Sequence, residues 1–587
     1  MRGRRLLAVS VIAAVAAGGA CGSTGGSSST RSTATGESAP TLVGAEGGTA
    51  TVDVAAIPTT LNANTVAGDN AATQMVAAAV WPQVFEVAPK VAPTLNTALV
   101  TSAEVVSVDP QTVEYQIDPR AVWSDGVPIS ADDFVYAWTM QRGGAADLDG
   151  SAASVASTAG YRDIASVTGS DGGTTVTVVF HTPFADWPSL FNDLVPAHIA
   201  ESVGWNHGFD RFDPSVVVSG GPWSVASWTP GTEMVLVKNP RWWGSPTHLD
   251  KIVLHVASGA DVAAADLTGG QAQVASPAGY DRTFLATVSS SPTLTSESAL
   301  GTTMLQLEFN VTHAPFTSAA VRQGIGQSID RLGIVTSVAQ SLDPMVSLDN
   351  DHLHANVQSG YEDNATGYPA ADPEAAKALF AQGGLVADQH GTWTSHGAPV
   401  VVHLAWAADD PWSSAAGPII AAELVSAGFD VAAQPVPSVV LLGSVLPTGA
   451  FDLALAPVAA GAYPTAMVRY FSTMDGPART GASFDWSGFD DPKVDALFTE
   501  AAQDLAGQSA QALYQQIDQV LWQELPTLPL FAEPIVVVSA VNLFGPQPDP
   551  GGSGVLWDAD QWFFLVPAPP KGTPARALGP EIASPTR

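Results

Sequence analysis

Hydrophobic and polar positions alternate with a period of two in short segments of the first half of the chain. The runs that alternate or are rich in β-branched residues are 49–55, 113–117, 174–180, 234–237 and 251–256. Runs of this length, separated by turn residues, predict β-strands. A helix is expected over residues 131–140, because Ser130 is a good N-cap and the acidic Asp132 and Asp133 favour the helix dipole in the first turn.

From Met304 onward, strand patterns are interleaved with helical periodicity. A strand predicted over residues 304–309 precedes a helix with one apolar stripe, formed by Val321, Ile325, Ile329 and Leu332. Two more helices are expected to begin after Asp372 and Asp491, where an Asp-Pro pair supplies an N-cap and a first helical residue. This interleaving predicts an α/β lobe.

The chain begins with a basic, then apolar, then small-residue leader that ends at Cys21, its single cysteine. The apolar stretch, residues 6–17, is shorter than the roughly 20 residues that a membrane-spanning helix needs. The pattern predicts a lipoprotein signal peptide over residues 1–20 and lipid attachment at Cys21. Gly18 stands where the usual motif has Leu, and the alternative is a chance cysteine in an ordinary leader.

Residues 21–43 are rich in Ser, Gly and Thr and offer almost nothing to bury. We expect a disordered tether that holds the folded part at a membrane through the N-terminal lipid anchor. The expected location is therefore the extracytoplasmic face of the cell membrane, in the periplasm or cell wall space.

The remaining ~540 residues exceed the size at which one core stops growing, so two or more lobes are expected. Without the three leader arginines, 19 Lys and Arg face 56 Asp and Glu, which gives a net charge of −37. A surface so acidic repels phosphate backbones, and we expect no nucleic-acid partner.

No catalytic motif of the G-x-S-x-G, HExxH or Walker type occurs in the chain. The acidic segment 349–354 contains two histidines and is the one metal candidate, but a solvated loop is the expectation we favour. The sequence therefore predicts no catalytic residue, no metal site and no cofactor.

Four segments, in this order along the chain, resemble stretches typical of the extracellular solute-binding proteins of family 5, the peptide- and nickel-binding components of ABC importers. They are YQIDPRAVWSDGVPISADDFVYAW (115–138), SGGPWSVASWTPGTEMVLVKNPRWW (219–243), LEFNVTHAPFTSAAVRQGIGQSIDRLGIV (307–335) and, between residues 451 and 530, FDLALAP, FDWSGFDDPKVDALFTEA and LPTLPL. Each piece alone is weak, and their order makes the resemblance specific.

The resemblance implies an α/β, two-lobed periplasmic-binding-protein-like fold of type II, hinged around a ligand cleft. It implies lobe I with an extra subdomain at residues 44–303, lobe II at residues 304–535, and a return to lobe I with a C-terminal tail at residues 536–587. A solute that contacts both lobes favours the closed form. The implied partners are an ABC permease complex in the membrane and a peptide, glycan or lipid-like solute, with the protein a monomer.

In peptide-binding members, an acidic residue that follows the strand resembling residues 451–457 pairs the α-amino group of the ligand. The stretch 451–463 has no acidic residue after Asp452. Because an unpaired buried ammonium costs several kcal/mol, this difference argues against ordinary free peptides and favours a neutral, sugar-bearing or lipid solute. One alternative is a non-transport role like that of actinobacterial LpqW-type lipoproteins, which are linked to cell-wall glycolipid assembly. A hydrolase is the least favoured alternative.

The resemblance and the local patterns together give six candidate ligand-binding residues. They are Thr60 and Asn62 after the first strand, Trp406 and Trp412 as stacking surfaces, and Ala459 and Tyr463 at the end of the strand just described. The plainer alternatives are a polar turn for the first pair and partly buried core aromatics for the tryptophans.

Overall fold

The computed structural model describes residues 42–568, apart from residues 89, 90, 278, 366, 369, 475, 476, 480–482 and 508. The predicted signal peptide, Cys21 and nearly all of the tether lie outside the described residues, as does most of the predicted C-terminal tail. Among the helices of the described part, none combines the length and apolarity that crossing a membrane requires.

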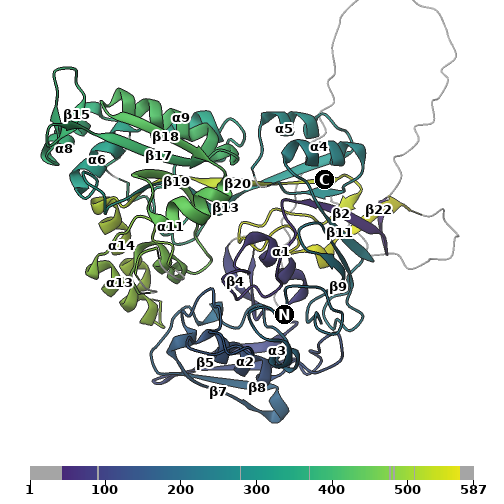
Figure 1. The fold of residues 1–587 in the computed structure, drawn as a ribbon. Helices are drawn as coiled ribbons and strands as arrows, with labels where there is room; N and C mark the ends of the chain where they lie inside the picture. Colours follow the sequence, from purple (N-terminus) through teal and green to yellow (C-terminus); the bar gives the residue numbers. More distant parts are fainter. Residues whose placement is uncertain are drawn as a thin grey trace, which may run out of the picture.

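A ten-stranded mixed sheet extends through both halves of the molecule (Figure 1). In spatial order its strands are β18 (Asp430–Val436), β17 (Val401–Ala407), β19 (Leu453–Ala459), β13 (Leu294–Phe309), β20 (Thr527–Ala540), β12 (Val274–Ala275), β2 (Thr49–Val54), β11 (Lys251–Val256), β10 (Glu233–Lys238) and β9 (Trp223–Thr229). We call the half at the β9 end lobe I and the half at the β18 end lobe II.

Strands β13 and β20 belong to both lobes. Their antiparallel register is broken over the longest stretch near the middle, where Leu300 pairs with Pro534 and the next pair is Met304 with Ala532, and it shifts again between Leu305 and Gln306. One part of β13 lies on the lobe I side of this interruption, and the other pairs with β19 in lobe II. The chain therefore passes between the lobes along these two neighbouring strands.

Lobe I covers its part of the sheet with helices and two small sheets. The helices are α1 (Ala71–Val80), α4 (Ala260–Gly269) and α5 (Arg282–Ser289). The small sheets are the hairpin of β3 (Phe85–Ala88) and β4 (Ala92–Leu95), and the sheet of β1 (Leu42–Ala45), β22 (Phe563–Pro567) and β21 (Leu543–Phe544).

A further layer on lobe I is a four-stranded antiparallel sheet in the order β5-β6-β8-β7 (Figure 1). Its elements are β5 (Val100–Val108), β6 (Gln111–Ile117), β7 (Ile164–Ser170), β8 (Thr175–Phe180) and the helices α2 (Ala131–Gln141) and α3 (Ala197–Val203). Helix α2 starts as the sequence predicts, with Ser130 and Asp133 forming a capping box.

Lobe II surrounds its strands with helices and a small sheet of β14 (Val386–Ala387), β15 (Trp393–Ser395) and β16 (Ala398–Pro399). The helices are α6 (Ala319–Ser328), α7 (Arg331–Ile334), α8 (Pro373–Gln382), α9 (Pro411–Ser426), α10 (Ser438–Val440), α11 (Leu446–Thr448), α12 (Val468–Phe471), α13 (Pro492–Gln503) and α14 (Ala510–Glu524). As predicted, α8 and α13 begin after the N-caps Asp372 and Asp491.

The single apolar stripe predicted from residue 321 to residue 332 is wrong at its end. Ile329 adopts an extended conformation, and the Asp330 carboxylate then caps a new helix by accepting from the backbone NH of Gly333 at 3.0 Å. This break rotates the next turn, so Leu332 is 49% exposed while Arg331 is buried. The local hydrogen bond of Asp330 outweighs the hydrophobic periodicity.

The alternation of β13 separates two cores, one of which also contains residues of α4 and α5 of lobe I. Leu305, Leu307 and Phe309 point into the core on one face of the sheet, and Met304 points into the core on the other. Lobe I has its own core, in which Trp81 lies 5.7 Å from Phe209 and 6.2 Å from Trp123 between ring centroids.

The buried carboxyl of Glu308 on β13 predicts how stability depends on pH. Burial raises the pKa of Glu308 to about 8, against the lowering effect of the Gln306 side-chain amide that donates to it at 2.8 Å. A carboxyl with a raised folded-state pKa stabilises the fold fully below its unfolded pKa and loses that contribution as pH rises. We therefore expect the free energy of unfolding, measured with urea, to fall between pH 5 and pH 9.

Glu308→Gln should reduce this fall, because the amide cannot ionise. Asp388→Asn is the matched control, since hydrogen bonds from the backbone NH groups of Thr392 and His390 lower the pKa of Asp388 and move its titration below this window. Equal pH dependence in the wild type and Glu308→Gln would contradict the assignment.

Candidate functional site

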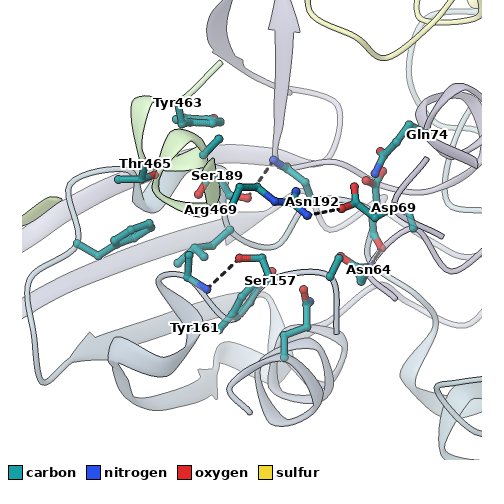
Figure 2. A pocket seen from close by; sticks show the side chains of 18 residues that line it. Asn64, Asp69, Gln74, Ser157, Tyr161, Ser189, Asn192, Tyr463, Thr465 and Arg469 are labelled. Atoms are coloured by element: carbon teal, nitrogen blue, oxygen red, sulfur yellow. Dashed lines mark hydrogen bonds and ion pairs between the residues drawn. The ribbon is translucent and has the colours of Figure 1, made fainter. Parts of the chain in front are cut away.

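A cavity of about 270 Å³ lies between the two lobes. On the lobe I side it is lined by polar side chains that include Asn64, Asp69, Ser157 and Asp193, and on the lobe II side by residues 463–469. Figure 2 shows Asn64, Asp69 and Ser157 converging with side chains from the lobe II side.

The lobe II side of the cavity is a short helical segment that follows β19. Pro464 occupies the first turn of a 3₁₀-helix, Pro464–Met467, which continues directly into α12. This geometry directs Tyr463, Thr465 and Arg469 at lobe I (Figure 2). The hydroxyl of Tyr463 is buried and has no hydrogen-bond partner within the described protein.

The lobe I side depends on a loop held by Asn62. The Asn62 amide donates to the Trp205 carbonyl at 2.9 Å, and its Oδ1 accepts from the backbone NH of Asn64 at 3.2 Å. Asn64 in turn donates to the Asp193 carbonyl at 3.0 Å. Thr60 accepts from the backbone NH of Asn62 at 3.3 Å. Thr60 and Asn62 are thus buried and shape the loop, while Asn64 lines the cavity.

Polar contacts join the two lobes around the cavity. The Arg469 guanidinium of lobe II forms an ion pair with the Asp69 carboxylate of lobe I at 3.1 Å (Figure 2). Thr465 donates to the Asp186 carboxylate from both its hydroxyl, at 2.7 Å, and its backbone NH, at 3.2 Å. The structure therefore shows the lobes in contact, with the cavity between them.

A second cavity, of about 320 Å³, adjoins the first. The two share Ala159, Phe184 and Thr465 in their linings. The second is more apolar, with Val468 and Met474 contributed by lobe II. A solute that extends beyond the polar cavity would meet this apolar surface.

Burial changes the electrostatics of the lobe I carboxyls. It raises the pKa of Asp193 to about 6, against the lowering effect of the Gln83 amide that donates to its Oδ1 at 2.8 Å. Burial likewise raises the pKa of Asp186, and the hydrogen bonds from Thr465 oppose that shift. On lobe II the charged lining group is Arg469, whose guanidinium carbon lies 3.9 Å from the centroid of the Phe484 ring.

Of the other candidates from the sequence, Tyr463 lines the cavity, whereas Trp406, Trp412 and Ala459 line neither cavity. Both tryptophans are buried in a core that also contains residues of α4 and α5, and Ala459 is exposed at the end of β19. Trp412 lies 5.6 Å from Tyr280 and 6.1 Å from Phe531 between ring centroids. Trp412 is buried because Asp410 caps the start of α9, and the first turn of this helix directs Trp412 toward the sheet.

The expectation of a solvated loop at residues 349–354 is wrong, because the segment is buried. His352 Nδ1 lies 2.7 Å from the Asp518 carboxylate, and the Asp351 carboxylate accepts from the backbone NH of Leu353 at 2.8 Å. These side chains fasten the segment to α14 and to its own backbone, so its two histidines are part of the packed interior.

Sequence reasoning missed most of the lining groups. Asn64, Asp69, Asp193 and Arg469 lie in loops or short helices without a distinctive motif. One signal was available in the sequence. Pro464 indicates the start of a helical segment, and Thr465 and Arg469 are four residues apart, so they are expected on the same face of that segment.

Comparison with known proteins identifies the family. Residues 94–481 match the model of bacterial extracellular solute-binding proteins, family 5. The chain belongs to this family. Among curated relatives in family 5, it is 28% identical to the oligopeptide-binding protein OppA of Mycobacterium tuberculosis over 519 residues, which covers 85% of this chain and 83% of OppA.

A second relative is the probable monoacyl phosphatidylinositol tetramannoside-binding protein LpqW of Mycobacterium tuberculosis. Identity to LpqW is 31% over 298 residues, which covers 50% of this chain. The match covers less than half of the length of LpqW, namely 44%.

Solved structures show the same family 5 fold. The periplasmic EDTA-binding protein EppA matches with a TM-score of 0.81 and 25% identity, over 90% of this chain and 99% of EppA. The oligopeptide-binding protein AppA of Bacillus subtilis, in complex with a nonapeptide, matches with a TM-score of 0.74 and 17% identity, over 89% of this chain and 99% of AppA. The predicted two-lobed α/β fold is confirmed.

The contact of Thr465 with Asp186 predicts how closure responds to mutation. Asp186→Ala removes two hydrogen bonds to a carboxylate between the lobes, so we expect the ratio of closed to open molecules to fall about tenfold. Small-angle X-ray scattering should report this as a larger radius of gyration.

Asp213→Ala is the matched control, because Asp213 makes the same pair of bonds to the backbone NH and hydroxyl of Ser215, at 2.8 and 2.6 Å, within lobe I. The control should keep the wild-type radius. An unchanged radius for Asp186→Ala would show that this contact does not hold the lobes together.

Proposed function

We propose that this protein is the membrane-tethered, extracytoplasmic solute receptor of an ABC importer, and that it captures a small solute by closing its two lobes. The observation that supports this most directly is the cavity between the lobes, lined by polar groups from both, in a member of family 5. The role involves binding and release, with no bond made or broken.

The proposed division of the chain follows the expectation from sequence. Residues 44–303 and the segment after residue 535 form lobe I, and residues 304–535 form lobe II. The interruption of the β13–β20 pairing between Leu300 and Met304 supports this division, because local bending is easiest where ladder hydrogen bonds are missing. Lipid attachment at Cys21 would keep this pair of lobes close to a permease in the membrane.

The lining favours a polar solute without a free ammonium group. Among the described residues, the lobe II lining of the polar cavity offers the hydroxyls of Tyr463 and Thr465 and the guanidinium of Arg469, but no carboxylate. Lobe I offers Asp69, which is already paired with Arg469, and Asp193. A solute rich in hydroxyl or carbonyl groups, such as a glycan or a blocked peptide, matches these donors and acceptors.

A second candidate function is a non-transport role in which the cleft binds a glycolipid or regulates its synthesis. The observation that favours it is the 31% identity to LpqW, whose name describes binding of a mannosylated phosphatidylinositol. The apolar second cavity beside the polar one would suit a solute that carries both a sugar and an acyl chain.

Thermal denaturation of the tag-free protein with oligopeptides, oligosaccharides and mannosylated phosphatidylinositols tests these functions. A true ligand raises the melting temperature with its concentration, because it binds only the folded state. Tyr463→Phe should weaken binding of that ligand about 2- to 10-fold, since it removes one buried hydrogen bond.

Tyr136→Phe is the control, because Tyr136 lies on α2 and lines neither interlobe cavity. Binding of a mannosylated lipid alone would support the second candidate. A ligand whose affinity is unchanged by Tyr463→Phe would contradict the assigned cleft, and no shift with any of these compounds would contradict both candidates.

A further inference from the structure

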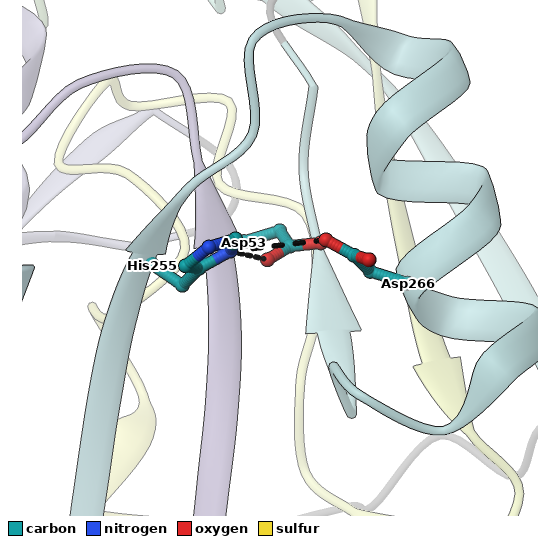
Figure 3. A group of neighbouring side chains, drawn as sticks. All are labelled: Asp53, His255 and Asp266. Carbon is teal, nitrogen blue, oxygen red and sulfur yellow. Dashed lines mark hydrogen bonds and ion pairs between the residues drawn. The ribbon is translucent and has the colours of Figure 1, made fainter.

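A cluster of Asp53, His255 and Asp266 lies on lobe I (Figure 3). None of these residues lines either interlobe cavity. Among the described residues, this is the one group of three or more carboxylate, imidazole or thiol side chains close enough to hold a metal ion. The cluster is therefore separate from the cleft, and an inference about it does not depend on the proposed function.

The fold brings together residues that are far apart in the sequence. Strands β2 and β11 are parallel neighbours, and their register sets Asp53 directly beside His255. Asp266 projects from α4 toward these two strands (Figure 3). The positions of the three side chains are fixed by regular elements, which suits a site with defined geometry.

The distances fit a small cation. His255 Nδ1 lies 2.9 Å from Asp53 Oδ1 and 3.8 Å from Asp266 Oδ2, and one ligand atom of each residue lies within 4.8 Å of the others. Ligands about 2.0 to 2.2 Å from a tetrahedral zinc ion lie about 3.3 to 3.6 Å apart, so small side-chain movements would complete the coordination.

A second observation comes from the Asp53 carboxylate itself. Asp53 is 2% exposed, and its Oδ2 is buried with no hydrogen-bond partner among the residues that the structure describes. Figure 3 shows this carboxylate between the imidazole of His255 and the carboxylate of Asp266. A buried carboxylate oxygen without a donor, next to a second carboxylate, is costly unless a cation or a shared proton lies between them.

We propose that Asp53, His255 and Asp266 form a zinc-binding site on lobe I. One imidazole nitrogen and two carboxylate oxygens are ligands that Zn²⁺ accepts, whereas Mg²⁺ and Ca²⁺ take oxygen ligands. The side chain of His255 is 51% exposed, so the ion can enter from solvent on that side and water can take the fourth position. A bound ion would tie α4 to β2 and β11 and stabilise lobe I.

Isothermal titration calorimetry and thermal melting of the tag-free protein with ZnCl₂ test this proposal. We expect binding of one Zn²⁺ per chain, a melting temperature that rises with Zn²⁺, and no matching rise with MgCl₂. The MgCl₂ arm controls for unspecific attraction of divalent ions to a chain with a net charge of −34. Binding of Co²⁺ should also give the visible absorption of a tetrahedral site.

His255→Ala should weaken Zn²⁺ binding about 100-fold or more. Asp266→Asn, at a residue on a partly exposed helix, is a second variant that should also weaken Zn²⁺ binding. His207→Ala is the matched control, because His207 pairs with Asp210 at 2.8 Å on the surface but is not part of the three-residue group. It should leave the affinity unchanged. If the wild type binds Zn²⁺ no more tightly than either cluster variant, the cluster is only a histidine paired with two carboxylates, and the proposal is wrong.

Discussion

The pairing of β13 with β20 is the constraint on which the rest of this structure depends. These two strands are central in the ten-stranded sheet and contribute residues to both lobes. Side chains of β13 form part of two cores on opposite faces of the sheet, so the strand cannot shift without disturbing both. Between Leu300 and Met304 the ladder is interrupted, and at Gly301 a Cβ atom would lie 3.0 Å from the Glu533 carbonyl. The strands therefore hold the lobes together, and their pairing is least regular between Leu300 and Met304.

Two kinds of contact join lobe I to lobe II. Around the cavity they are polar, with the ion pair of Arg469 and Asp69 and the hydrogen bonds of Thr465 to Asp186. Where Trp412 packs against Tyr280, the contact is aromatic and buried. A partly exposed polar contact is individually weak and exchanges readily with water or solute, whereas buried aromatic packing resists separation. This difference is consistent with a cleft that opens on its polar side.

The sequence predicted individual helices and strands from local signals, and it predicted the two-lobed fold through the resemblance of four segments to family 5. Helix starts at Ser130, Asp372 and Asp491 were predicted from capping chemistry alone. The candidate site was predicted less well, because its geometry comes from tertiary packing. Trp412 is an aromatic residue of the kind that stacks on ligands, but its position on α9 buries it in the core. The lining residues Asn64 and Arg469 belong to no recognisable sequence motif. The cluster of Asp53, His255 and Asp266 exists only through strand register and helix placement.

Single-molecule fluorescence energy transfer between the lobes tests the central claim most directly. One dye would be attached through Val106→Cys on β5 of lobe I and the other through Val439→Cys on α10 of lobe II, both exposed positions, with Cys21→Ser removing the native thiol. The account predicts two interconverting distances in solute-free protein, with the shorter one growing as solute is added. One fixed distance under every condition would contradict it.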